Sequence, residues 1–128
     1  MADGKDFLGL IGLKPRSEGG ERIYEITVTP ELMNPYGVLH GGVVYSLADT
    51  SMGGAISPEL APNERSATIE ITIHYLRPVR AGVIRAETRV VQRGRRVATL
   101  ESEVFNIDGG EPQLVAKALG SFAIFEVK

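Results

Sequence analysis

The segment from His40 to Ile56 constrains the fold of this chain most, because it predicts a helix that is apolar around most of its circumference. Pro58 and Pro62 follow the segment and stop the helix. At about 100° per residue, the small and polar side chains form a single narrow stripe. The stripe consists of Gly42, Ser46, Asp49, Thr50 and Gly53. A helix of this kind is buried on nearly all sides, so we expect the rest of the chain to wrap around it.

The remaining segments predict strands, because apolar and polar residues alternate along them. They span Glu21 to Thr29, Ser66 to Leu76, Val83 to Gln92, Arg96 to Phe105 and Leu114 to Phe125. In the second segment, the alternation places five residues on one side of the strand, namely Ala67, Ile69, Ile71, Ile73 and Tyr75. Ahead of all these strands, Asp6 to Leu13 predicts a short amphipathic helix that is ended by Gly12 and Pro15.

The order of these elements in the sequence is one strand, one long helix and four more strands, or β-α-β-β-β-β. We therefore predict an α+β fold of the hotdog type, in which a curved antiparallel sheet wraps around one long central helix. A length of 128 residues fits a single domain spanning residues 1–128.

Composition excludes several classes of protein. The sequence contains no run of 18 apolar residues, so it predicts no membrane span. The first residues lack the basic and apolar regions of a signal peptide. A net charge of −2 argues against nucleic-acid binding. With no cysteine, the chain has neither disulfides nor a thiol nucleophile, which favours the cytoplasm. Two histidines without a metal-ligand spacing predict no metal site, and we expect no cofactor.

A loop rich in turn residues and glycine, Asn34 to Gly42, leads into the predicted helix. The first turn of a helix has free backbone N–H groups and the positive end of the helix dipole, so it can stabilise developing negative charge. Gly41 and Gly42 have no side chain that would keep a ligand atom away from these donors. The carboxylate of Asp49 lies further along the same helix. Either it pairs with a neighbouring polar group and only shapes the fold, or it is the acid of an acyl-transfer site.

Gly41 and Asp49 lie eight residues apart in the sequence, which is roughly 12 Å along a helix. One small reactive centre cannot easily touch both, so a site that uses both must take its acid from a second subunit at a homodimer interface. An electrophilic carbonyl would place its oxygen on the Gly41 N–H, and Asp49 would attack it or activate water. A site with so few catalytic groups favours a thioester substrate. A thiol has a pKa of about 8.5, so a thiolate can leave without help from a strong acid. The chain contains no G-x-S-x-G elbow.

The pattern Asn34, Gly37, His40-Gly41-Gly42 and Asp49, with Leu47-Ala48 before the acid, resembles the hotdog-fold acyl-CoA thioesterases. It is most similar to the phenylacetyl-CoA thioesterase (PaaI-like) group. The run from Thr68 to Pro78 also looks like the second strand of that family and its exit. The resemblance extends from about Glu21 to Phe125, and the spacing from His40 to Asp49 is its most specific part.

This resemblance implies an enzyme that hydrolyses aryl- or medium-chain acyl-CoA to the free acid and coenzyme A. Gly41 would be the backbone oxyanion donor, while Asn34 and His40 would order the loop and the thioester. Asp49 of the partner subunit would be the nucleophile or general base. Thr68 falls where relatives carry a hydroxyl that positions the water. The resemblance also implies a homodimer, assembled further into a homotetramer.

Relatives that act on hydroxybenzoyl and dihydroxynaphthoyl thioesters usually have Glu at the position of Asp49, which favours the phenylacetyl branch. The resemblance also implies that the nucleotide lies near two basic turns, and arginine suits phosphate through paired donors. The turns are Arg77-Pro78-Val79-Arg80 and the hairpin turn Arg93-Gly94-Arg95-Arg96. The residues expected to bind substrate and coenzyme A are Gly42, Arg77, Pro78, Arg93 and Arg95. Arg85 and Arg89 are instead expected to face solvent opposite Glu101 and Glu103.

Two other functions remain open alongside the thioesterase. An acyl-CoA hydratase or dehydratase shares the fold and needs a His–Asp or His–Glu pair, for which only His40 is a candidate. A non-catalytic acyl-CoA binding module would keep the arginines but would not require Asp49. His40 itself is either a loop-ordering residue or a general base, whereas His74 is expected on the surface. The acyl group is not determined by the sequence.

Overall fold

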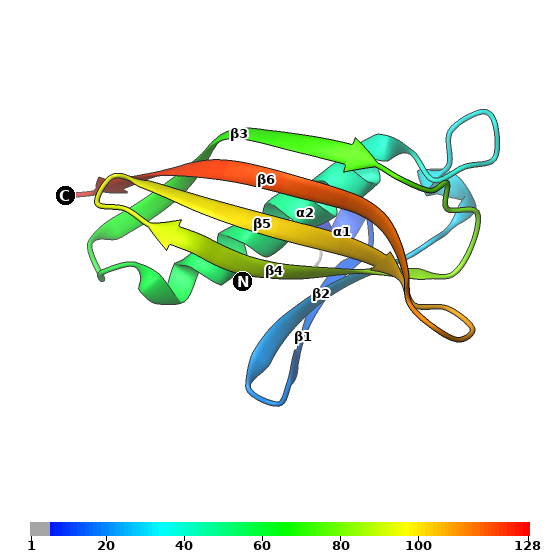
Figure 1. The fold of residues 1–128 in the computed structure, drawn as a ribbon, viewed down its shortest axis with the longest axis horizontal. Coiled ribbons are helices and arrows are strands. Elements are labelled where there is room, and N and C mark those ends of the chain that lie inside the picture. The colour runs from blue at the N-terminus through cyan, green and yellow to red at the C-terminus, as the bar shows by residue number, and fades with distance from the viewer. Residues whose placement is uncertain (1–5) are drawn as a thin grey trace.

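The structure is a computed structural model that describes residues 6–128. A six-stranded antiparallel sheet has the strand order β1-β2-β4-β5-β6-β3 and curves around the long helix α2, which lies behind the strands in Figure 1. The predicted α+β hotdog fold is therefore confirmed. The elements are α1 (Phe7–Leu10), β1 (Leu13–Glu18), β2 (Glu21–Thr27), the 3-10 turn η1 (Pro30–Leu32), α2 (Gly41–Ile56), η2 (Ser57–Glu59), β3 (Glu64–Tyr75), β4 (Val83–Arg93), β5 (Val97–Asn106) and β6 (Gln113–Glu126).

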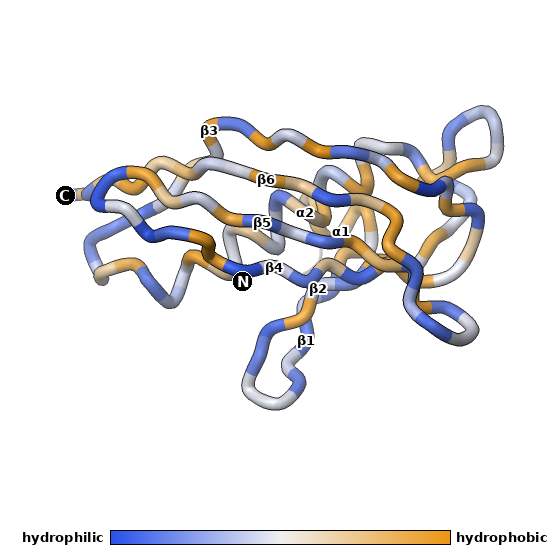
Figure 2. The backbone as a smooth tube through the Cα atoms, viewed as in Figure 1, coloured by the Kyte–Doolittle hydropathy of each residue, from blue (hydrophilic) through white to orange (hydrophobic). Residues whose placement is uncertain are grey.

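Helix α2 is buried as the sequence indicates. Leu47, Ala48, Met52 and Ile56 have no exposed surface, whereas Asp49 and the other members of the small and polar stripe keep some. Hydrophobic and hydrophilic residues alternate along the strands that cover the helix (Figure 2), so one face of the sheet packs on α2. Strand β6 passes so close to the helix that a Cβ at Gly120 would lie 2.7 Å from Met52 Sδ.

The sequence prediction missed β1, which lies at one edge of the sheet and pairs with β2 from Leu13↔Ile26 to Glu18↔Glu21. Only the first residue of β1 is buried, so buried and exposed residues do not alternate along the strand as they do in a strand with one face on the core. Pro15 also argues against a strand, but a proline is tolerated on a strand at the sheet edge because its missing N–H points away from the ladder. The predicted N-terminal helix is shorter than expected.

The prediction for β3 was wrong on which residues share a face. Thr68 pairs with Phe122 and Glu70 pairs with Ser121, so Ile69 is an extra residue in a β-bulge. The bulge exposes 55% of Ile69 and turns Thr68 toward α2. Ile71 and Ile73, beyond the bulge, pack against the core. Ala67 and Ile69 therefore do not share a face with Ile71 and Ile73.

An ion-pair cluster on the outer side joins β1, β2 and β4. Glu25 accepts from Arg16 at 3.1 Å and from Arg85 at 2.7 Å. The hydrogen bond from Arg16 is the main cause that lowers the pKa of Glu25. Arg89 lies opposite Glu101 and pairs with it, as predicted, whereas Arg85 takes its partner from β2 and not from β5. No helix in residues 6–128 has both the length and the apolar surface to cross a membrane.

Candidate active site

The first turn of α2 is capped by His40, whose Nδ1 accepts a hydrogen bond from the Gly42 N–H at 2.8 Å. This bond assigns the proton of the neutral imidazole to Nε2, because Nδ1 acts as the acceptor. None of the residues in 6–128 accepts a hydrogen bond from the Gly41 N–H. The first helical residue therefore keeps a free backbone donor at the positive end of a 16-residue helix.

Asn34 organises the loop that precedes the helix. Its Oδ1 accepts from the Tyr36 N–H at 2.9 Å and from the Val38 N–H at 3.1 Å, while its own N–H donates to the Val38 carbonyl at 2.7 Å. The end of the loop is tied to the rest of the molecule, since the Leu39 N–H donates to the Val79 carbonyl at 2.7 Å. These bonds fix the backbone that leads into Gly41.

Asp49 is half-buried on α2, and Thr68 of β3 donates its hydroxyl hydrogen to Asp49 Oδ1 at 2.7 Å. The bulge at Ile69 is what turns Thr68 toward the helix. Asp49 Oδ2 accepts no hydrogen bond from the described part of the chain. The carboxylate is thus held through one oxygen and has the other available.

The structure does not bring Gly41 and Asp49 together within one chain. Both lie on one continuous helix, α2, and eight residues separate them, which corresponds to roughly 12 Å. The structure therefore contains two half-sites: the Gly41 donor with its loop, and the Asp49–Thr68 pair.

Tyr75, at the end of β3, is a residue of the first half-site that the sequence analysis treated only as part of an apolar strand face. Its hydroxyl donates to the Gly41 carbonyl at 2.7 Å. Its ring covers Gly41 so closely that a Cβ there would lie 3.1 Å from the ring. Burial, and to a smaller extent Tyr45, raises the pKa of Tyr75, so the hydroxyl remains a donor at neutral pH. The sequence signal that could have indicated this role is the hydroxyl of a tyrosine at the end of a strand, because a buried tyrosine hydroxyl usually has a hydrogen-bond partner.

A cavity of about 280 Å³ lies beside the free donor, and its lining includes Gly41, Val44, Tyr75, Arg77 and Pro78. Most of the other lining residues are apolar. A larger hollow of about 1120 Å³ is lined by the β1–β2 hairpin, the C-terminal end of α2 with η2, and parts of β4 and β5, and none of the predicted site residues lines it. We therefore assign the candidate site to the smaller cavity, where a backbone donor and predicted substrate-binding residues meet.

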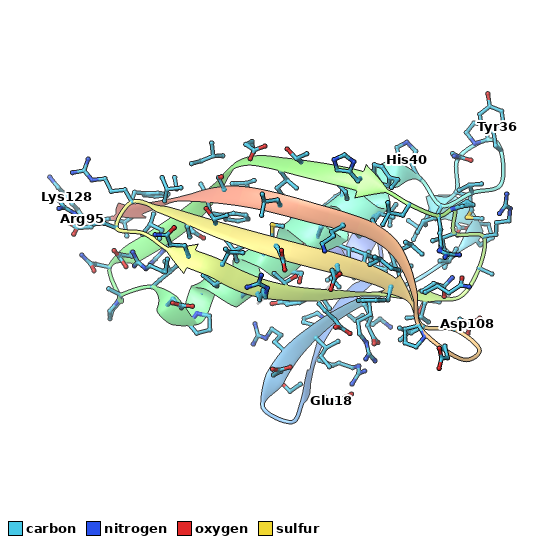
Figure 3. All side chains as sticks on the ribbon, in the orientation of Figure 1. Glu18, Tyr36, His40, Arg95, Asp108 and Lys128 are labelled. Atoms are coloured by element: carbon cyan, nitrogen blue, oxygen red, sulfur yellow. The ribbon has the colours of Figure 1, made fainter. Side chains whose placement is uncertain are left out.

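The basic hairpin between β4 and β5 lies far from this cavity. Figure 3 shows Arg95 and His40 toward opposite ends of the molecule. The Arg93 guanidinium pairs with Glu64 at 2.7 Å and donates to backbone carbonyls, including that of Gly94 at 2.7 Å. Within one chain, Arg93 and Arg95 therefore do not reach the Gly41 half-site, whereas Arg77 does.

His74 is exposed, as the sequence indicated. Across residues 6–128, no three His, Asp or Glu side chains come close enough together to hold a metal ion.

Comparison with known proteins identifies the family. Residues 36–113 match the family model of the thioesterase superfamily. The acyl-coenzyme A thioesterase PaaI of Escherichia coli is 32% identical over 88 residues, covering 68% of this chain and 61% of PaaI. A conserved protein of Pseudomonas aeruginosa has 38% sequence identity and a TM-score of 0.82, with 93% of each chain covered. The crystal structure of a Bacillus halodurans protein with CoA has 27% sequence identity and a TM-score of 0.82. The match covers 92% of this chain and 74% of the Bacillus halodurans chain.

The chain therefore belongs to the thioesterase superfamily of hotdog-fold proteins. Within that superfamily it is a thioester hydrolase of the PaaI-like group.

Proposed function

We propose that this enzyme hydrolyses acyl-CoA thioesters, with aryl or medium-chain acyl groups, to the free acid and coenzyme A. The observation that carries the proposal is the free Gly41 N–H at the start of α2, next to an apolar cavity of about 280 Å³. The name of Escherichia coli PaaI and the coenzyme A in the Bacillus halodurans structure support this substrate class. The reaction needs no cofactor, and we place the enzyme in the cytoplasm.

The reaction begins with the thioester carbonyl oxygen accepting a hydrogen bond from the Gly41 N–H. As the tetrahedral intermediate forms, this donor and the positive end of α2 stabilise the oxyanion. The carbon–sulfur bond then breaks, and coenzyme A leaves as a thiolate. His40 Nδ1 is occupied by the Gly42 N–H, so His40 holds the first turn of the helix and does not take a proton at that atom.

Asp49 of the partner subunit supplies the nucleophile or activates it. As general base, Asp49 takes a proton from water and the resulting hydroxide adds to the carbonyl carbon. As nucleophile, its free oxygen adds directly, and water later hydrolyses the mixed anhydride. Thr68 holds the other oxygen of the carboxylate in both routes.

The homodimer that this site requires can form along β3. This strand is the last in the sheet order and has no partner on its outer edge among residues 6–128. Two β3 edges that pair antiparallel about a twofold axis place the Glu64 end of one strand beside the Tyr75 end of the other. The partner's Asp49 and its basic hairpin then approach Gly41. We also propose that two such dimers form a homotetramer.

We propose that Arg77 and the partner's Arg95 contact the phosphates of coenzyme A, while Pro78 and Gly42 border the bound substrate. Neither Arg77 nor Arg95 forms an ion pair with residues 6–128. Arg93 keeps the hairpin in place through Glu64.

The test is thiol release from a panel of aryl and aliphatic acyl-CoAs by wild type and Asp49→Ala. We expect turnover by the wild type and a loss of at least about 10²-fold in the variant, the usual scale for acid–base catalysis. Asp108→Ala, the same change at an exposed aspartate, is the matched control and should keep the wild-type rate. No turnover with retained CoA binding would instead indicate a binding module. Loss of crotonyl-CoA absorbance without thiol release would indicate a hydratase.

A further inference from the structure

The peptide group between Gly41 and Gly42 is held on both sides by side chains. Its N–H donates to His40 Nδ1 at 2.8 Å, and its carbonyl accepts from the Tyr75 hydroxyl at 2.7 Å. His40 lies in the loop before α2, whereas Tyr75 lies at the end of β3. Because a peptide group is planar, one bond on each side fixes the orientation of the whole group.

This peptide group needs an external restraint because of the residue that precedes it. Gly41 has no Cβ and samples a wider range of backbone torsions than any other residue type. It also stands at the first position of the helix, where the backbone frays most easily. The ring of Tyr75 disfavours a larger residue here, since a Cβ would lie 3.1 Å from it, closer than an ordinary van der Waals contact. The same residue thus favours the flexible glycine and restrains it.

An oxyanion donor is effective only when it already points at the position that the oxygen will occupy. The Gly41 N–H is bonded to the same Cα as the carbonyl that Tyr75 holds, so only the torsions within Gly41 separate the two groups. The tyrosine donates its hydrogen to the carbonyl and leaves the N–H of Gly41 unoccupied.

We propose that Tyr75 is a positioning residue, whose hydroxyl tethers the Gly41 carbonyl so that the Gly41 N–H points at the thioester carbonyl oxygen. This role rests on the proposed acyl-CoA hydrolysis, but the tether itself exists without substrate. The alternative is that Tyr75 only packs, with its ring lining the cavity beside Gly41. The two roles differ in one atom, because packing needs the ring and the tether needs the hydroxyl.

The decisive variant is Tyr75→Phe, which keeps the ring and removes the hydroxyl. The matched control is Tyr36→Phe, because Tyr36 is 89% exposed and points away from the body of the molecule in Figure 3. We expect Tyr75→Phe to lower kcat about tenfold and to change KM by less than about twofold, the pattern of a loss confined to the transition state. Thermal unfolding of both variants shows whether the fold is intact.

Two analogues of the best substrate sharpen the test. A trifluoromethyl ketone that replaces the thioester adds water, whose proton passes to the partner's Asp49, or adds that carboxylate directly. Its carbonyl oxygen then becomes the oxyanion of a tetrahedral adduct, whereas an alkyl thioether of coenzyme A has no carbonyl at that position. Tyr75→Phe should weaken binding of the ketone by the same factor as kcat and leave thioether binding unchanged. Equal weakening of both analogues would overturn the positioning role in favour of packing.

A measurement without substrate separates this proposal from the proposed function. In the ligand-free protein, amide hydrogen exchange at Gly42, whose N–H is held by His40 Nδ1, should be faster in Tyr75→Phe than in wild type or Tyr36→Phe. Unchanged exchange at Gly42 together with a wild-type kcat would overturn the tether. Faster exchange in an enzyme whose wild type hydrolyses no acyl-CoA would support the tether and overturn the proposed function.

Discussion

At the scale of single residues, the hydrogen bond between Thr68 and Asp49 occupies only one oxygen of the carboxylate, so a paired Asp49 can still be the acid of a site. The sequence left open whether Asp49 pairs with a polar neighbour or acts as the acid of a site. In the structure its Oδ1 accepts from Thr68 at 2.7 Å, and its Oδ2 has no partner among residues 6–128. A hydrogen bond to a charged group is stronger than a neutral one, so Thr68 holds the carboxylate in one orientation.

Removing this hydroxyl should reduce catalysis without unfolding the protein. A hydrogen bond to a charged group contributes about 1.5–3 kcal/mol, so we expect Thr68→Val to lower kcat about 10- to 100-fold. Thr68→Ser keeps the hydroxyl and should retain most of the activity. Thiol release by both variants, at matched thermal stability, checks this expectation. A valine variant at the wild-type rate would show that Thr68 does not orient the acid.

At the scale of elements, the sequence predicted the features that depend on local residue patterns. It failed for features that depend on how one strand pairs with another. The all-round apolar pattern of α2 and the alternation of its covering strands are local, and both were confirmed. The bulge at Ile69 follows from how β3 pairs with β6, so uninterrupted alternation placed Ile69 on the wrong face. The same alternation would have turned Thr68 outward, and only the family resemblance assigned it to the site.

Contacts between distant segments account for the rest of the difference. The hydrogen bond from the Tyr75 hydroxyl to the Gly41 carbonyl joins residues 34 positions apart, and the sequence around neither residue predicts it. The strand β1 forms because it pairs with β2. Its own sequence does not predict a strand, since apolar and polar residues do not alternate along it and it contains Pro15. The half-sites could be named from the sequence, and their separation follows because α2 is one continuous helix from Gly41 to Ile56.

The cap of α2 gives a prediction that separates the structural role of His40 from a catalytic one. An N-cap replaced by Ala loses about 1 kcal/mol, which corresponds to roughly 4 °C in thermal midpoint for a domain of this size. We therefore expect His40→Ala to be less stable and less active. His40→Asn supplies another capping side chain and should restore both properties, whereas a general base would not be replaced by an amide.

Thermal unfolding and thiol release of both His40 variants test this, with His74→Ala as the matched control at an exposed histidine. Stability restored in His40→Asn while activity stays absent would contradict a purely structural role and assign proton transfer to His40.

At the scale of the whole molecule, the two edges of the sheet differ in a way that favours association along only one of them. The edge strand β1 spans six residues and contains Pro15, both of which protect an edge from pairing. The edge strand β3 spans 12 residues and exposes 55% of Ile69 and 52% of Tyr75. An edge of this length without proline is suited to pairing with a second copy of the same strand along the regular stretches on either side of the bulge at Ile69.

A site shared between two subunits can be tested by mixing two inactive variants. Asp49→Ala removes the acid, and Gly41→Pro removes the N–H donor. The first position of a helix tolerates the backbone of proline, and the Tyr75 ring must shift by a few tenths of an ångström to admit the new Cβ. In a mixed dimer, the chain with intact Gly41 faces the chain with intact Asp49, so one of the two sites is complete. Equal mixing with free exchange should therefore restore about a quarter of the wild-type activity.

The same mixture distinguishes the shared site from a site within one chain, because in the latter case every chain remains defective and no activity returns. Each variant is first shown to be folded by circular dichroism and to have the wild-type assembly size, so that a failure to recover activity cannot come from a failure to associate. Recovery that rises and falls with the proportion of mixed dimers would then establish that Gly41 and Asp49 of different subunits act on one thioester, as their separation along α2 requires.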